Sequence, residues 1–67
     1  MRIKTGRDIY AERKRRGLTA NRFCQLTGID RTILRAMESG LCVPSQETID
    51  KALALFELVD RKRRVAA

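Results

Sequence analysis

The stretch from Thr19 to Gly40 constrains the fold of this chain most, because it combines two short helical patterns with one glycine between them. Thr19 can cap a first short helix, and Gly28 can adopt the positive φ that ends it sharply. Asp30 can then cap a second helix, Arg31 to about Ser39. Helices this short are marginal in isolation and need packing partners. The stretch therefore predicts two helices joined by a tight turn and docked on a larger domain.

Helical signals continue on both sides of this stretch. Thr5 and Asp8 have capping-box spacing, which predicts a helix from about Gly6 to Arg16. Pro44 and the polar residues after it predict the entry to a last helix. The apolar face of that helix is made by Ile49, Ala52, Leu53, Phe56 and Val59, widened by Leu55 and Leu58. We expect an all-α, compact four- to five-helix bundle, with a basic lead at 1–4, a domain at 5–58, and an extended helix end or basic tail at 59–67.

Charge and composition narrow the classes of function. The chain has 67 residues with 15 Lys and Arg against 8 acids, a formal net charge of +7. The basic excess lies at the two ends, which favours a polyanionic partner. With no His and only Cys24 and Cys42, a metal site or a catalytic set is not expected, nor a cofactor. Cys24 is better explained as a small buried side chain than as a nucleophile. We expect a reduced cytoplasmic protein without a membrane segment, although the sequence leaves a disulfide open.

The central stretch meets the stereochemical demands of a helix-turn-helix. Cys24 supplies a small residue where the two helices touch, Gly28 supplies the turn, and apolar residues pin both helices to the domain; these are Phe23, Ile29, Leu34 and Met37. Such a motif places its second helix in the major groove of DNA. The sequence therefore predicts a double-stranded DNA partner.

The chain also resembles a known family, the lambda-repressor-like or XRE-type helix-turn-helix regulators of phages, plasmids and bacteria. The resemblance extends from about Arg7 to Leu58 and rests on Arg13 four residues before Gly17-Leu18-Thr19, the central stretch, Glu38-Ser39-Gly40, and Pro44 to Thr48. It implies a sequence-specific transcriptional regulator, most simply a repressor of mobile-element type.

The resemblance implies roles for particular residues. Arg13 and Glu38 match a structural ion pair, and Arg31, Thr32 and Ala36 match positions that reach base edges. Ala20 departs from the family, which often has a phosphate-binding Gln at that position. Ile33 also departs; it can contact the DNA, or it can belong to the core if the helix is rotated.

Further contacts follow from the residues themselves. Arg35, one turn beyond Arg31, can bind a base or a phosphate, or remain a solvated surface residue. Phosphate contacts are expected where helix ends and backbone N–H groups face the strand, at Thr19, Asn21, Arg22 and Ser39. In the run Arg13 to Arg16, each side chain taken alone is best explained as a solvated helix end.

A lone recognition helix contacts only a few base pairs, so a homodimer on a palindromic operator is expected. The last helix is the expected dimer interface, through Leu55, Leu58 and Val59. The alternative function is an antitoxin-like or other protein-interaction module that binds a protein partner with the same apolar face.

Overall fold

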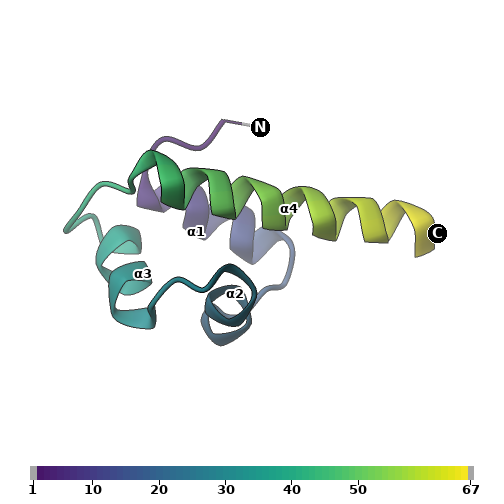
Figure 1. Ribbon diagram of the computed structural model, residues 1–67, viewed down its shortest axis with the longest axis horizontal. Helices are drawn as coiled ribbons and strands as arrows, with labels where there is room; N and C mark the ends of the chain where they lie inside the picture. Colours follow the sequence, from purple (N-terminus) through teal and green to yellow (C-terminus); the bar gives the residue numbers. More distant parts are fainter. Residues whose placement is uncertain (1, 67) are drawn as a thin grey trace.

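Four helices make up the computed structural model, which describes the backbone of residues 2–66 and the side chains of residues 2–63 (Figure 1). They are α1 (Gly6–Arg15), α2 (Ala20–Thr27), α3 (Arg31–Glu38) and α4 (Gln46–Ala66). The described residues contain no strand, so the predicted all-α fold is confirmed with four helices. Met1 and Ala67, the outer ends of the predicted lead and tail, lie outside the described residues.

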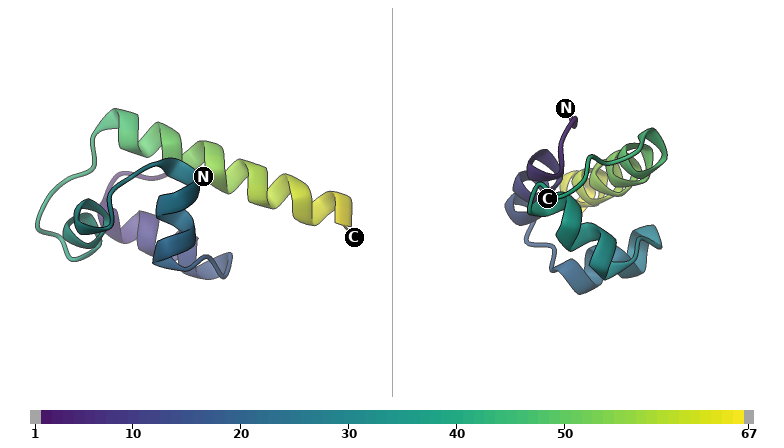
Figure 2. Two further views of the ribbon diagram at one scale, coloured as in Figure 1. Left: turned by 60° about the horizontal axis from the view of Figure 1, so that its bottom comes forward. Right: turned by 90° about the vertical axis from the view of Figure 1, so that its left-hand side faces the viewer.

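The helices are arranged in two crossed layers. In Figure 1, α4 runs along the top with α1 beside it, while α2 and α3 lie beneath them. α1 packs against α3 and α4, and α2 packs against the same two helices. The left view of Figure 2 shows that the C-terminal end of α4 projects past the other three helices.

One apolar core lies where the four helices meet. Its fully buried members come from every helix: Ile9, Phe23, Leu34, Met37 and Phe56. The rings of Phe23 and Phe56 lie 5.9 Å apart between centroids and join α2 to α4. A core of this size leaves a small domain with a narrow margin of stability, so polar contacts between the helices matter for how firmly they are held together.

The predicted caps are present at the first three helices. Thr5 and Asp8 form a capping box, in which the Thr5 hydroxyl accepts from the Asp8 N–H at 3.2 Å and the Asp8 carboxylate accepts from the Thr5 N–H at 3.0 Å. Thr19 accepts from the N–H of Arg22 at 3.1 Å, and Asp30 accepts from that of Thr32 at 2.7 Å. These local signals explain why the helix starts were predictable from sequence.

The last helix extends into the basic segment. Of the two alternatives for residues 59–67, the described part, as far as Ala66, is a continuation of α4. Asp60 and Arg63 of this extension bond to Arg16 at the end of α1, so the extension is attached to the rest of the fold.

Gly6 sets the distance between α1 and α3. A Cβ added at Gly6 would overlap the carbonyl group of Met37 and crowd the N atom of Glu38. The first turn of α1 therefore touches the backbone at the end of α3, an approach that only glycine permits.

Candidate nucleic-acid interface

The turn between α2 and α3 is built by three adjacent residues. Gly28 has φ 77° and ends α2, with its N–H donating to the Cys24 carbonyl at 2.8 Å. The Thr27 hydroxyl donates to the Phe23 carbonyl at 2.8 Å and accepts from the Ile29 N–H at 3.3 Å. Ile29, the residue directly after the turn, is buried, and this anchor fixes the direction in which α3 leaves the turn.

α3 has a buried side and an exposed side. Leu34 and Met37 are buried against the core, whereas Arg31, Thr32 and Arg35 are exposed and Ala36 is half-buried. Ile33 is 52% exposed, which decides between its two alternatives in favour of the surface. The part of α3 that faces solvent thus carries two guanidinium groups, a hydroxyl and an isoleucine.

Arg13 and Glu38 hold the end of α3 against α1. Arg13 Nε lies 2.9 Å from Glu38 Oε2, and Arg13 Nη2 lies 3.1 Å from Glu38 Oε1, so the two groups form a bidentate ion pair. Arg13 Nη1 also donates to the Leu18 carbonyl at 2.8 Å. The side chains of the pair are only 8% and 12% exposed. A guanidinium so placed joins α1, the segment before α2, and α3.

The predicted phosphate-contacting residues divide into two groups. Thr19, Asn21 and Arg22 are exposed around the N-terminal end of α2, where the helix dipole favours an anion. Ala20, the departure from the family pattern, is half-buried against the core and offers no polar contact to a phosphate.

The end of α3 differs from expectation. The N–H groups of Ser39, Gly40 and Leu41 donate to carbonyls of α3, at 2.9, 3.2 and 2.8 Å, and the Ser39 hydroxyl donates to Ala36. These three backbone N–H groups are therefore not available to a DNA strand, because the helix end already uses them. Ser39 itself is exposed but would have to give up its bond to Ala36 to contact a phosphate.

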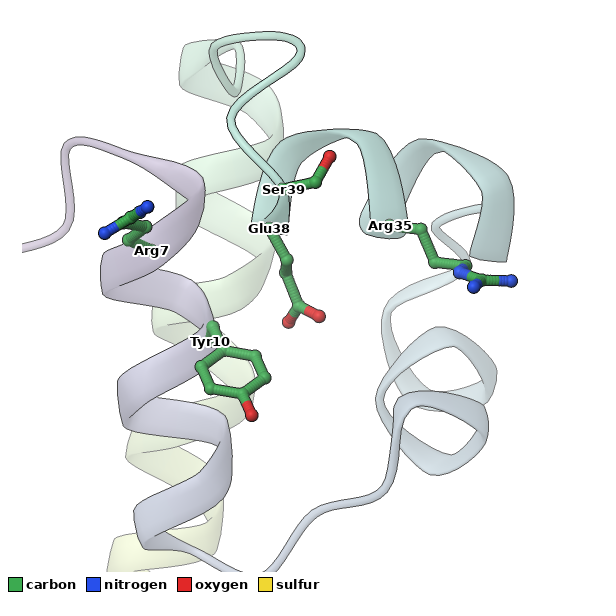
Figure 3. Close-up of a pocket in the computed structure, with 5 residues that line it drawn as sticks. All are labelled: Arg7, Tyr10, Arg35, Glu38 and Ser39. Atoms are coloured by element: carbon green, nitrogen blue, oxygen red, sulfur yellow. The ribbon is translucent and has the colours of Figure 1, made fainter.

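An open hollow beside α3 adds two residues that sequence reasoning missed, Arg7 and Tyr10, to three that it had named (Figure 3). Arg7 and Tyr10 of α1 line one side, and Arg35 and Glu38 of α3, with Ser39 directly after it, line the other. Figure 3 shows the Glu38 carboxylate between the two helices. Arg13 pairs with that carboxylate, and the guanidinium groups of Arg7 and Arg35 lie at the two opposite edges of the hollow (Figure 3). The sequence signal for Arg7 was the basic excess of the N-terminal end, and nothing in the sequence indicated Tyr10.

A second buried arginine was also missed. Arg16 binds Asp60 through two hydrogen bonds of 2.9 and 2.7 Å, and it binds the Glu12 carboxylate at 2.7 Å. Its guanidinium carbon lies 4.7 Å from the Phe56 ring centroid. The interpretation of a solvated helix end was thus wrong for Arg16, and also for Arg13 three residues earlier, because both are under 9% exposed. It holds for the two residues between them, Lys14 and Arg15, which are exposed.

The contact between Arg16 and Asp60 shifts the pKa values of both groups. Hydrogen bonds from Arg16 lower the pKa of Asp60, and the same bonds raise the pKa of Arg16. No sequence pattern links residues so far apart along the chain, so the contact could be found only from the folded structure.

The two cysteines are free thiols. Cys24 is half-buried and packs against the core, as predicted for the small residue between α2 and α3, and burial raises the pKa of its thiol. Cys42 is exposed. Among residues 2–66 no cluster of His, Cys, Asp or Glu forms a metal site. No described helix is both long and apolar enough to cross a membrane.

The three residues predicted at a dimer interface are not equally available. Leu58 is 46% exposed and Val59 is half-buried, but Leu55 is only 6% exposed and belongs mainly to the core. Leu55 can therefore offer a partner only its edge.

Comparison with known proteins gives a match to a protein family. A family model described as a helix-turn-helix domain matches residues 6–66, nearly the whole chain. No curated protein and no solved structure matches the chain.

Proposed function

Because the chain belongs to the helix-turn-helix domain family, of the lambda-repressor type, we propose that it is a sequence-specific regulator that reads double-stranded DNA with α3. The observation that carries this proposal is the division of α3 into a buried side and a side that exposes Arg31, Thr32 and Arg35. Proteins of this family are typically not enzymes, and we assign no reaction to the chain.

The base-reading roles follow from chemistry and position. Arg31, in the first turn of α3, can bind the O6 and N7 of a guanine with its two-pronged donor group. Thr32 can donate to a base or contact a thymine methyl group, and the exposed Ile33 suits an apolar contact with such a methyl. Ala36 can make only an apolar contact, and Arg35 lies at the edge where base and phosphate contacts meet.

Phosphate contacts are proposed on both sides of α3. On one side they come from Thr19, Asn21 and Arg22 at the start of α2. On the other side the hollow lined by Arg7 and Arg35 accepts the opposite part of the strand. Phosphate contacts fix the register of the protein on the duplex, and base contacts then supply the discrimination.

Two copies on a palindromic operator remain part of the proposal, since one short α3 contacts few base pairs. Pairing through Leu58 and Val59 would bring the basic side chains around them against their own counterparts, because a two-fold interface is made by the same surface on both copies. We therefore propose that the two copies are brought together by the two half-sites of the operator, and not by an interface between the copies. Occupation of a promoter in this way represses transcription, which fits a small cytoplasmic repressor of bacterial or phage origin.

The test is selection of bound sequences from a random DNA pool, followed by affinity measurements on Arg31→Ala. We expect this variant to lose discrimination at one base pair per half-site, at a cost of about 1–3 kcal/mol on the preferred sequence. Arg15→Ala removes the same charge from an exposed site on α1 and should leave discrimination intact. Equal weakening of operator and random DNA by Arg31→Ala would refute the reading role.

A further inference from the structure

A groove between α2 and α4 exposes apolar side chains that the DNA-reading face does not use. Leu26 of α2 and Leu58 of α4 are 47% and 46% exposed, and Leu18, Leu55 and Val59 line the same space. An adjoining hollow shares Leu26, Leu55 and Leu58 and continues the surface along α4. We call this surface the α2–α4 groove. Contiguous exposed apolar surface in a small protein marks an interaction site more often than a scatter of single leucines does.

The rim of the α2–α4 groove is basic. Arg22, Lys51, Lys62 and Arg63 line it, and no described carboxylate does. Lys51 lies 3.5 Å from Glu47, and Arg63 donates to the Arg16 carbonyl at 2.9 Å. The side chains of Arg22 and Lys62 form no ion pair with any described residue. The groove therefore combines an apolar floor with positive charge at its edge, of which Arg22 and Lys62 have no ion-pair partner among the described residues.

We infer that the α2–α4 groove binds a segment of a partner protein whose apolar side is flanked by aspartate or glutamate. The apolar floor requires apolar side chains from the occupant, and the rim requires carboxylates. A DNA strand satisfies the rim but not the floor, because its outer surface is phosphate. A second copy of this chain satisfies the floor but not the rim, since it would bring cations against cations.

The groove is formed before any partner arrives. Arg16 binds Asp60 from α4 at 2.7 Å, and Arg63 bonds back to the end of α1, so the C-terminal part of α4 is held in place beside α2. A rigid groove loses little freedom on binding, which favours affinity for a short segment. Arg22 is shared between this rim and the proposed phosphate contacts of α2, whereas the two exposed leucines, Leu26 and Leu58, have no proposed contact with DNA.

The test begins with selection of peptide binders to the full chain from a display library of helical peptides of random sequence. We expect the selected peptides to combine an apolar face with acidic flanks. Leu58→Gln should lower the affinity of the chain for the synthesised peptides about tenfold, which corresponds to the loss of one anchor contact. Leu41→Gln is the matched control, because Leu41 is 83% exposed and lies outside the groove, so it should leave binding unchanged. Thermal unfolding of both variants verifies that the fold persists.

A second pair of variants separates the rim from the overall charge of the chain. Lys62→Glu should lower the affinity for the selected peptides several-fold at low salt. Lys14→Glu, an equal change of charge outside the groove, should lower it less. Equal effects of the two reversals would refute the role of the rim.

Other outcomes would overturn the inference as well. These are a selection that enriches nothing, peptides without acidic residues, peptides that bind Leu58→Gln as well as the unchanged chain, and a dimer in sedimentation that Leu58→Gln dissociates. The last result would assign the groove to a second copy. Operator affinity of the unchanged chain is measured in parallel, so that a failure of the DNA-reading proposal is distinguished from a failure of this one.

Discussion

The ion pair between Arg13 and Glu38 offers the sharpest test of how this small domain is held together. Glu38→Ala removes the carboxylate while leaving the guanidinium of Arg13 in place. The pair contributes two hydrogen bonds, at 2.9 and 3.1 Å, and its side chains are 8% and 12% exposed. After the substitution, the guanidinium keeps its bond to the Leu18 carbonyl but has no counter-charge.

The magnitude follows from this burial. Removing one partner of a buried ion pair costs about 3–5 kcal/mol, because the charge that remains is neither paired nor well solvated. A domain of this length has a total stability of only about 3–10 kcal/mol. Glu38→Ala should therefore remove a large part of the free energy of unfolding and leave a detectable fraction of unfolded chain at moderate temperature.

Urea unfolding followed by circular dichroism measures this loss. Arg15→Ala is the comparison, because Arg15 pairs with Glu12 at 3.1 Å with its own side chain 72% exposed. Such a surface pair contributes about 0–1 kcal/mol. If Glu38→Ala cost no more than Arg15→Ala, the pair would not be desolvated and the reasoning would be refuted. The double variant Arg13→Met with Glu38→Leu should cost less than the sum of the single changes.

Three further outcomes can be measured on the same chain. Gly6→Ala should cost about 1–3 kcal/mol in urea unfolding, since the added Cβ overlaps the backbone at the end of α3. Arg16 lowers the pKa of Asp60, so this pair stabilises the fold at pH values above the ordinary aspartate pKa, and the stabilisation is lost as the pH falls through the lowered pKa. Asp60→Asn should therefore reduce the loss of stability in acid. Arg7→Gln should reduce the slope of log affinity for DNA against log salt by about 0.9, and Arg15→Gln should change it less.

The fold was predictable from sequence where local signals decide it. The capping residues Thr5, Thr19 and Asp30 each bond to the N–H that their spacing implies, and Gly28 ends α2 with the positive φ expected of it. Such signals act within a few residues, so each helix start can be inferred without knowledge of its neighbours. The buried side of α3 was predictable for the same reason, from the spacing of its apolar residues.

Contacts between distant helices were not predictable in the same way. Arg16 lies in a run of four basic residues, and nothing in that run distinguishes the side chain that turns inward to Asp60. Gly6 shows no turn or cap pattern, because its role depends on how closely α3 approaches. The exposure of Ile33 depends on the rotation of α3 about its own axis, which apolar spacing sets only to within a fraction of a turn.

The rotation of α3 about its axis also explains the role of the ion pair between Arg13 and Glu38 at the end of that helix. Leu34 and Met37 could pack against the core over a range of rotations, since apolar contacts are not directional. The bidentate ion pair between Arg13 and Glu38 fixes the orientation of the last turn of α3 and its distance from α1, because the planar donor and acceptor groups match in one arrangement. Arg31 lies two turns earlier on the same short helix, so its direction in space is set by the same contact. Arg13→Lys keeps the positive charge but cannot form both hydrogen bonds to Glu38. We therefore expect this variant to lose more affinity for the operator than for random DNA. Equal losses of affinity on both would indicate that the pair supports stability alone.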